Sequence, residues 1–363
     1  MTSDGRPIGV GVIGLSATGG WAARSHVPAL RLVDSVRLVA CSASSADSAR
    51  AAAQVHGVER AHPDARSLVS DPAVDVVLVT VKVPDHRAAV EQALRAGKHV
   101  YCEWPLGRST AEAEALLQAA EKAGRLTFVG LQARRSPAVT LVRDLVGDGA
   151  VGEVLDTAIA GTGLVGTPIQ TSRSAYQLDV DNGAHLGTIA LAHLVDTVGH
   201  VLGPWDSLVV VERTAFPQVE LKDAGRTAPA TSPDHVVAAG SAGGVLATIH
   251  VRPGKPEFGL PGLRWEIRGT HGALVVRGEL ALPQMTRISV ELRDESGSRL
   301  TTWDDLTASL PTTDPVVVPL LDVWQAVADA VRFGHSGLPG FGDAVPLHRR
   351  LDTARGTADY ASS

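Results

Sequence analysis

The sequence predicts an N-terminal α/β domain with a doubly wound parallel sheet, followed by an α+β domain built on a mostly antiparallel open sheet. Near the N-terminus, an apolar strand runs into a glycine-rich turn and the start of a helix. Buried apolar runs then alternate with amphipathic helical segments, whereas from Glu153 onward strand-like segments follow one another through short turns. A chain of 363 residues is too long for one ordinary core. We therefore expect two domains, residues 1–133 and 134–363.

Strands and helices alternate through the first domain. After the strand that begins at Ile8, the predicted strands are 36–41, 74–81, 98–102 and 126–131, and the predicted helices are 45–55, 85–96 and 109–123. Ser109 and Glu112 form a capping box, and Gly97 and Gly124 stand just past helix ends. Pro137 marks the first turn of a further helix. Apolar strands alternating with helices indicate a parallel sheet covered on both faces, the Rossmann architecture.

The turn after the first strand is typical of a dinucleotide site. Gly9 and Gly11 fall inside the strand, where glycine would only weaken the ladder, so the fingerprint is assigned to the turn, with Ser16 in place of the middle glycine. Backbone N–H groups at such a turn bind a pyrophosphate. A strand-to-helix turn without a ligand would show the same glycines. The candidate cofactor contacts in the turn are Gly14, Ser16, Ala17, Thr18 and Gly19.

The end of the second strand favours NADP over NAD. An acid at this point accepts hydrogen bonds from the ribose of NAD, but here Ser42, Ser44 and Ser45 precede the first carboxylate, Asp47. Serine hydroxyls donate to a 2′-phosphate, which a carboxylate would repel. Ser42 and Ser44 are therefore candidate cofactor contacts, with NAD still possible. Serines are also ordinary helix caps, and Ser44 or Ser45 could simply start the next helix.

In the second domain, strands and helices no longer alternate. Its predicted strands are 154–160, 207–213, 235–241, 245–251, 264–268, 273–276 and 287–292, and its predicted helices are 183–202, 316–333 and 344–360. The segments 161–182 and 217–233 are rich in Gly, Pro, Ser and Thr and are predicted to be loops. Such loops are candidates for substrate contact or are surface loops without a function.

Composition excludes several classes of partner. The net charge of −6 gives no reason to expect nucleic acid, and no apolar run approaches the length of a membrane span or signal peptide. We expect a cytoplasmic protein with neither partner. Cys41 and Cys102 lie in predicted buried strands and are interpreted as core residues rather than as a metal or redox site.

The order of motifs resembles the Gfo/Idh/MocA oxidoreductases, a family of glucose-fructose oxidoreductase and inositol dehydrogenase type. Besides the glycine turn, the resemblance rests on the segments Thr80–His86, His99–Leu106 and His193–Asp196. Segments Gly14–Ala22 and Leu131–Pro137, together with Glu103-Trp104, are most similar to the branch of fungal galactose-regulon repressors, which bind a dinucleotide yet act as regulators. The resemblance implies further cofactor contacts from Thr80, Val81, His86, Glu103, Trp104, Pro105 and Gln132.

Two catalytic positions depart from the family pattern. The family's Glu-Lys-Pro motif implies a lysine beside the nicotinamide, but this position is Trp104, and an indole cannot exchange the substrate proton. The family's aspartate four residues before a histidine is replaced by Ile189, whereas His193 keeps the histidine. We expect His193 to act as the proton carrier, with Asp196 one helical turn on to orient its ring. A hydrogen-bonded core histidine is the alternative.

The predicted helix 183–202 places five polar and apolar positions along one face: His185, Ile189, His193, Asp196 and His200. No second ligand cluster appears elsewhere, so we expect no metal. The candidate substrate contacts are Trp104, Arg134, Tyr176, Asp181, Asn182, His185, Ile189 and His193. A solvated or salt-bridged face is the alternative for Arg134 with Arg135.

Two functions remain open from the sequence. The first is an NADP-dependent oxidoreductase that acts on a sugar or polyol, or on a keto sugar, through His193. The second is a catalytically silent dinucleotide-binding sensor that resembles the galactose repressors. Because the family commonly pairs subunits through the C-terminal sheet, the resemblance also implies a homo-dimer or homo-tetramer.

Overall fold

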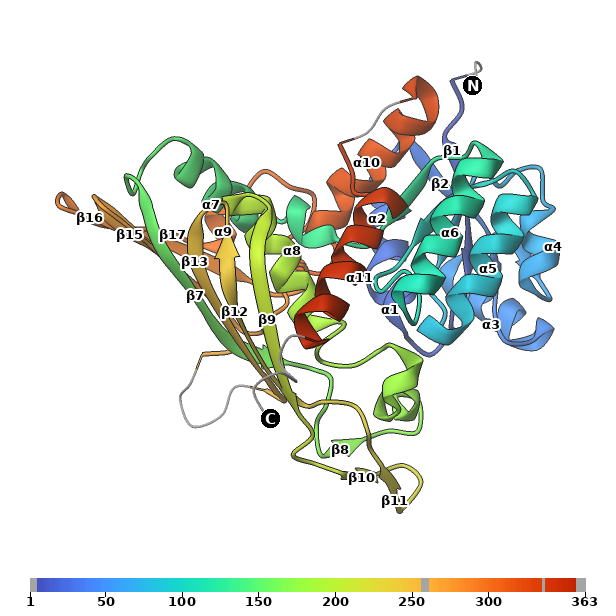
Figure 1. Cartoon of the computed structure of the whole chain (residues 1–363). Helices are drawn as coiled ribbons and strands as arrows, with labels where there is room; N and C mark the ends of the chain where they lie inside the picture. Colours follow the sequence, from blue (N-terminus) through green and yellow to red (C-terminus); the bar gives the residue numbers. More distant parts are fainter. Residues whose placement is uncertain (1–4, 256–260, 335–336, 357–363) are drawn as a thin grey trace. The chain divides into compact units, whose positions relative to one another are not determined.

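The structure is a computed structural model that describes residues 5–255, 261–334 and 337–356. It divides into two compact units, each with its own sheet (Figure 1). The first unit contains Met1–Gln132 and Val316–His348, and the second contains Ala133–Pro315 and Arg349–Ser363. The division at residue 132 lies next to the predicted boundary, but the segment 316–348, which the sequence assigns to the second domain, belongs to the first unit.

The first unit is built on six parallel strands in the order β3-β2-β1-β4-β5-β6, which confirms the predicted doubly wound sheet. The strands are β1 (Ile8–Ile13), β2 (Val36–Ser42), β3 (Arg60–His62), β4 (Val76–Val79), β5 (His99–Cys102) and β6 (Thr127–Val129). Strands β1 and β4 are buried along their whole length, as strands covered on both faces are. The short strand β3 was not predicted, because its Arg-Ala-His sequence has no apolar run.

The helices of the first unit begin and end at the residues that cap them. Ser45 and Ser109 accept hydrogen bonds from the third residues of their helices, and Gly57 and Gly124 end the same helices in the left-handed region. The helices are α1 (Trp21–Arg24), α2 (His26–Leu32), α3 (Ala46–His56), α4 (Ala65–Val69), α5 (Val83–Arg95) and α6 (Thr110–Ala123). The sequence missed α4, a five-residue helix too short to show a period.

Helix α10 (Val318–Phe333) packs into the core of the first unit although it follows residues 133–315 of the second unit in the sequence. Leu320, Val323, Trp324 and Val327 are buried in the same apolar cluster as the strand β1 residues. Burial of each such side chain contributes roughly 1.5–3 kcal/mol. Periodicity predicts the helix but carries no information on which sheet it covers. For this reason the predicted second domain, 134–363, includes residues 316–348, which belong to the first unit.

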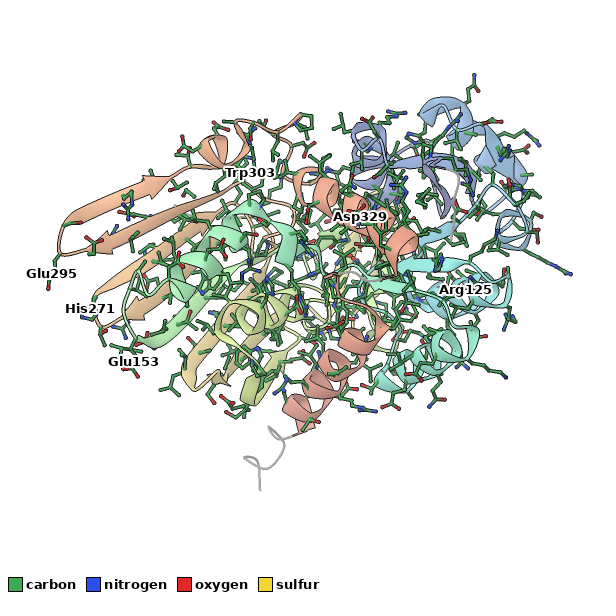
Figure 2. All side chains as sticks on the ribbon, turned by 90° about the horizontal axis from the view of Figure 1, so that it is seen from above. Arg125, Glu153, His271, Glu295, Trp303 and Asp329 are labelled. Carbon is green, nitrogen blue, oxygen red and sulfur yellow. The ribbon has the colours of Figure 1, made fainter. Side chains whose placement is uncertain are left out.

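The second unit contains an eight-stranded sheet in the order β17-β16-β15-β14-β7-β13-β12-β9. Its pairs are antiparallel except β7 with β13, which confirms a mostly antiparallel sheet. The strands are β7 (Val154–Gly163), β9 (Trp205–Arg213), β12 (His235–Ala242), β13 (Val245–Pro253), β14 (Leu263–Gly269), β15 (Gly272–Gly278), β16 (Ile288–Asp294) and β17 (Gly297–Thr301). Figure 2 shows Glu153, His271 and Glu295 at the turns of one end of this sheet.

A second, three-stranded sheet forms where the sequence predicts loops. Strands β8 (Ile169–Gln170), β10 (Gln218–Leu221) and β11 (Arg226–Pro229) pair in the order β11-β10-β8. The sheet has a small core of its own, made by Leu178, Val219, Leu221 and Ala228. These strands have two to four residues each, so their apolar positions are too few to stand out among the surrounding Gly, Pro and Thr.

Helix α7 (Pro137–Gly147) packs against β16, and α8 (Ala190–Leu202) packs against β12 and β13. The prediction of a helix over 183–202 is wrong at its start, because α8 begins seven residues later, at Ala190. Thr188 donates from its hydroxyl to the carbonyl of His185, a local hydrogen bond that competes with helix formation. The remaining helices are α9 (Trp303–Thr307) and α11 (Phe341–Gly356). Helix α11 starts three residues before its prediction, and its predicted end at Tyr360 lies outside the described residues.

Candidate functional site

The glycine turn lies at the point where the strand order of the first sheet reverses, between β1 and β4. The amides of Gly14 and Leu15 both donate to the carbonyl of Ser42, at 3.0 and 3.1 Å, and tie the turn to the end of β2. Gly14 has a φ of 98°, and a Cβ there would lie 2.9 Å from Val81 Cγ1. Only glycine fits this position. In open α/β sheets the crevice at such a point receives the ligand.

The two glycines inside strand β1, Gly9 and Gly11, lie where a side chain would clash with the segment before β4. A Cβ at Gly9 would lie 1.9 Å from the carbonyl oxygen of Ala73, and a Cβ at Gly11 would lie 2.9 Å from Val74 Cγ2. The prediction that these glycines only weaken the ladder is therefore incomplete. They allow the segment before β4 to approach β1 closely.

The rest of the turn is held by short-range contacts. Ser16 accepts from the amide of Thr18 at 3.3 Å, and the ring of His56 contacts the carbonyl of Ser16 at 2.9 Å. Gly19 has a φ of 121°, and a Cβ there would meet no atom within 4 Å. Ala17 lies between them and is partly exposed. The space beside the Gly19 Cα is therefore open, just before helix α1.

The end of β2 fits a ligand with acceptor oxygens. The Ser42 hydroxyl is buried without a hydrogen-bond partner among the described residues, and such an orphan group costs about 1–3 kcal/mol until a partner arrives. Ser44 is exposed, whereas Ser45 caps helix α3. One of the two predicted alternatives for the serines, helix capping, therefore holds for Ser45.

The loop after β4 is joined to the loop after β5 by a buried histidine. Thr80 donates from its amide and hydroxyl to the carbonyl of Ile13, both at 3.1 Å, next to Val81. The His86 ring lies between two carbonyls, with Nε2 3.1 Å from Val81 O and Nδ1 2.9 Å from Pro105 O. Burial lowers the pKa of His86, which favours the neutral ring. His86 thus contacts protein backbone at both ring nitrogens.

Glu103 is engaged within the protein. Its carboxylate accepts from His26 Nε2 at 2.6 Å and from Gln132 Nε2 at 2.9 Å. The indole of Trp324 donates to His26 Nδ1 at 3.1 Å, so the hydrogen of a neutral His26 is at Nε2. Sequence reasoning missed His26 and Trp324. The signal available for His26 was a histidine in an apolar helical segment, and such a residue is equally typical of a solvent-facing position.

Trp104 is buried against a histidine that the sequence analysis did not select. The ring of His348, from helix α11, lies 4.6 Å from the indole between ring centroids, and both residues are less than a tenth exposed. The peptide bond between Trp104 and Pro105 is cis. The position to which the resemblance assigns a lysine therefore holds an aromatic side chain beside an imidazole.

In the second unit, His193 lies in the first turn of α8 and is buried. Its amide donates to the carbonyl of Ile189 at 3.1 Å, and its own carbonyl accepts from Thr197. The Asp196 carboxylate is bound in a bidentate pair by Arg134 at 2.6–3.1 Å. That Asp196 also orients the His193 ring stays a prediction. The predicted alternative, a salt-bridged Arg134, is confirmed.

The other predicted members of the helix face are arranged differently. His185 lies before α8, and Ile189 is the N-cap residue, so neither continues the face of the helix. Burial and then Arg355 lower the pKa of His185 to about 3. Burial and nearby arginines lower the pKa of His200 to about 4, and Arg143 contacts its Nε2 at 3.3 Å. Both rings are therefore neutral near pH 7.

The remaining predicted substrate residues lie in two short 3₁₀ turns before α8. Asn182 donates from its side chain to the carbonyl of Tyr176 at 2.7 Å, which fixes the two turns to each other. Burial raises the pKa of Tyr176, and Asp181 is exposed. Among residues 5–255, 261–334 and 337–356, no cluster of His, Cys, Asp or Glu is arranged to hold a metal ion. None of the described helices has the length and apolar character of a membrane span.

Two family models match two successive segments of the chain. The model described as an oxidoreductase family with an NAD-binding Rossmann fold (Gfo/Idh/MocA) matches residues 8–131, and that of the Gal80p C-terminal domain matches residues 137–278. Dehydrogenase aclE of Aspergillus oryzae is 31% identical over 340 residues, which cover 86% of this chain and 93% of that protein.

Other relatives include regulators as well as dehydrogenases. The galactose/lactose metabolism regulatory protein GAL80 of Saccharomyces cerevisiae is 27% identical, over 78% of this chain and 69% of its own. Levoglucosan dehydrogenase of Pseudarthrobacter phenanthrenivorans is 28% identical, over 68% of this chain and 67% of its own.

Solved structures show the same fold. A super-repressor mutant of Gal80p from Saccharomyces cerevisiae superposes with a TM-score of 0.87 at 24% identity, covering 98% of this chain and 97% of its own. A levoglucosan dehydrogenase in complex with NADH and levoglucosan gives a TM-score of 0.81 at 21% identity, covering 98% of each chain.

Proposed function

Because this chain belongs to the Gfo/Idh/MocA oxidoreductase family, with a Rossmann domain followed by a Gal80-like domain, we propose that it transfers hydride between NADP and a sugar or polyol, or a keto sugar. The observation that carries the proposal is the turn at the strand-order reversal. There Gly14 leaves no room for a side chain, and the Ser42 hydroxyl has no hydrogen-bond partner among the described residues. Levoglucosan dehydrogenase, as a relative, supports the substrate class.

The residues present fit a dinucleotide. The turn from Gly14 to Gly19 would hold the pyrophosphate through its backbone, as helix-leading turns do. Ser42 and the exposed Ser44 would face the adenine ribose and favour a 2′-phosphate, because no carboxylate follows β2 before Asp47. The bound cofactor supplies the hydride acceptor or donor.

His193 would move the proton that accompanies the hydride. On oxidation of a carbinol, the hydroxyl proton would go to a ring nitrogen of His193, and the same nitrogen would return it on reduction of the carbonyl. Imidazole suits this exchange because its ordinary pKa lies near neutrality. An indole at Trp104 cannot replace it, since it has an N–H donor and no accessible ionisation.

A titration with each dinucleotide tests the cofactor. We expect tighter binding of NADPH than of NADH by isothermal calorimetry, and reduction of NADP⁺ with levoglucosan or a related sugar, followed by absorbance. Ser44→Asp should reverse the preference, because a carboxylate repels the 2′-phosphate. Equal or tighter binding of NADH by the unaltered protein would contradict the serine argument.

A catalytically silent sensor is the second candidate, and Trp104 favours it. The resemblance implies a lysine at the position that this buried indole occupies. The GAL80 relative is a regulatory protein by name. A silent sensor would bind a dinucleotide, yet no sugar in a panel of aldoses, anhydrosugars and cyclitols would drive its reduction. Measurable turnover with any of them would reject this candidate.

A further inference from the structure

Three consecutive residues after strand β5 each contact a different histidine. Glu103, Trp104 and Pro105 form this loop, and the histidines come from helices α2, α11 and α5. The loop lies at the carboxyl end of a parallel strand, the edge at which such sheets bind ligands. All three histidines, His26, His86 and His348, are more than nine-tenths buried in the first unit.

The contact at Glu103 is the end of a chain of hydrogen bonds. Trp324 donates to His26, His26 donates to the Glu103 carboxylate at 2.6 Å, and Gln132 donates to the same carboxylate. The His26 ring also packs edge-on against Tyr101 and Trp324, with centroids 5.4 and 5.6 Å apart. Neither the position of the ring nor its tautomer is free to change without loss of one of these contacts.

The contact at Pro105 joins two strand ends. The His86 ring lies between two carbonyls, with Nδ1 beside Pro105 O and Nε2 beside Val81 O. Cys102 Sγ lies 3.4 Å from His86 Nδ1. A carbonyl only accepts, so a neutral ring donates to one of the two carbonyls. In either tautomer the ring keeps the loop after β4 and the loop after β5 at a fixed separation.

The contact at Trp104 is between ring faces. The imidazole of His348 lies 4.6 Å from the indole at an angle of 40°. A planar ring on the indole restricts its rotamers, because any rotation of the indole must displace the imidazole.

We propose that His26, His86 and His348 are positioning residues that hold the loop Glu103–Pro105 in the conformation required for dinucleotide binding. The inference rests on the proposed cofactor function. A loop that is already ordered does not lose conformational entropy when the cofactor arrives, so affinity depends on the three contacts. Their role differs from that of cofactor contacts, because each histidine acts through the loop.

NADPH titrations of single variants test this inference. We expect His26→Ala and His86→Ala to weaken NADPH binding about tenfold or more, the effect of one lost hydrogen bond to a fixed group. The matched control is His99→Ala, at the amino end of the same strand β5, where the ring accepts from the amide of Leu126. This variant should lower the melting temperature and leave the NADPH affinity unchanged.

Conservative variants separate positioning from general stability. Asparagine at 86 retains a donor at the place of Nδ1, glutamine at 26 retains one at the place of Nε2, and phenylalanine at 348 retains a ring against Trp104. We expect His86→Asn, His26→Gln and His348→Phe to bind NADPH more tightly than the corresponding alanine variants. If an alanine variant at 26 does not fold, Trp324→Phe removes only the donor to His26 and should itself weaken binding.

The outcomes distinguish this inference from the proposed function. Alanine variants that fold and bind NADPH as the unaltered protein does would overturn the positioning role while leaving the cofactor assignment intact. Alanine variants whose affinity falls no further than that of His99→Ala would also overturn it. An unaltered protein that binds no dinucleotide would reject both, whereas one that binds but oxidises no sugar would reject only the enzymatic function.

Discussion

At Gly14, a Cβ would lie 2.9 Å from Val81 Cγ1 and 3.0 Å from the Val81 amide nitrogen, in a backbone with a φ of 98°. We expect Gly14→Val to abolish dinucleotide binding, because both the clash and the strained φ move the turn away from the crevice. The fold should persist by circular dichroism, with a lower melting temperature. Calorimetric titration with NADPH measures the loss.

A second left-handed glycine provides the control. Gly57 ends helix α3 with a φ of 60°, and a Cβ there would meet no atom within 4 Å. Gly57→Ala should therefore cost about 1 kcal/mol of unfolding free energy from backbone conformation alone and leave NADPH binding intact. If Gly14→Val binds NADPH as well as Gly57→Ala does, the turn is not the pyrophosphate site.

His193 is the residue on which the enzymatic proposal depends. If the protein turns over a sugar, His193→Ala should lower the turnover number by roughly two to four orders of magnitude, the usual share of a general acid or base. The dissociation constant for NADPH should barely change. Steady-state kinetics with the best sugar of the panel give the turnover number, and calorimetric titration with NADPH gives the dissociation constant. Turnover that survives the substitution would mean that the proton leaves through another residue.

The complementary experiment adds the family pair. If the protein is silent, Trp104→Lys with Ile189→Asp restores the lysine and aspartate that the resemblance assigns to these positions, and weak turnover is expected. For the His193→Ala experiment, His200→Ala is the control, because it also removes an imidazole from α8, at a ring that Arg143 contacts. It should leave any turnover within a few fold, about the size of a change without a lost proton carrier.

At the scale of the element, helix α8 and the turn before it make stability depend on pH. His185 has its pKa lowered from 6.5 to about 3, and His200 has its pKa lowered from 6.5 to about 4, in both cases first by burial. In the unfolded chain these rings bind protons below pH 6.5, while in the folded protein they stay neutral. The unfolded state therefore binds more protons, and the free energy of unfolding falls as the pH drops from 6.5 toward 4.

Urea unfolding at several pH values measures this dependence. His185→Gln should show a smaller loss of unfolding free energy between pH 7 and pH 5 than the unaltered protein, since one neutral buried ring is removed. Asp and Glu residues also contribute to acid destabilisation, so the difference between the two proteins is the quantity to compare. Parallel pH profiles would show that His185 is protonated equally in the folded and unfolded states.

Elements with long periodic or apolar sequences could be predicted from the chain, and those fixed by tertiary contacts could not. The parallel strands other than β3, and helix α10, have clear patterns that predict them. The start of α8 depends on the Thr188–His185 hydrogen bond, and the small sheet depends on pairing between strands far apart in the chain. Neither leaves a local pattern. Sequence periodicity likewise places α10 but not the core that it joins.

The candidate site was predictable in its backbone and less so in its side chains. Gly14 and the end of β2 follow from local patterns, whereas the partners of Glu103 come from segments that lie far away in the sequence. His26 is 77 residues from Glu103, and Trp324 is 298 residues from His26. A lone histidine in an apolar segment does not reveal its partner. For the same reason the sequence does not reveal that Arg134 is a partner of Asp196, 62 residues away.

At the scale of the whole molecule, one face of the large sheet differs between its two halves. Across β9, β12 and β13, the register pairs Val211 with Val237 on the exposed face, and the same face carries Val209 and Leu246. These four side chains are 42–68% exposed. Across β7 and β14 to β16, the same face has ion pairs such as Arg268 with Asp156 and Arg277 with Glu291. Ion pairs protect one half of the sheet in water, and the other half presents a bare apolar patch.

A second copy of the chain is the occupant that we propose for the apolar patch, because large bare patches are uncommon on soluble monomers and mark association surfaces. We therefore expect a homo-dimer or homo-tetramer by light scattering at micromolar concentration. Leu246→Glu should shift the protein toward the monomer, since a carboxylate in a buried interface loses its hydration. Val55→Glu, at another exposed apolar side chain on helix α3, should leave the assembly unchanged. A monomer at this concentration would contradict the assignment, and an oligomer that survives Leu246→Glu would place the interface on a different surface.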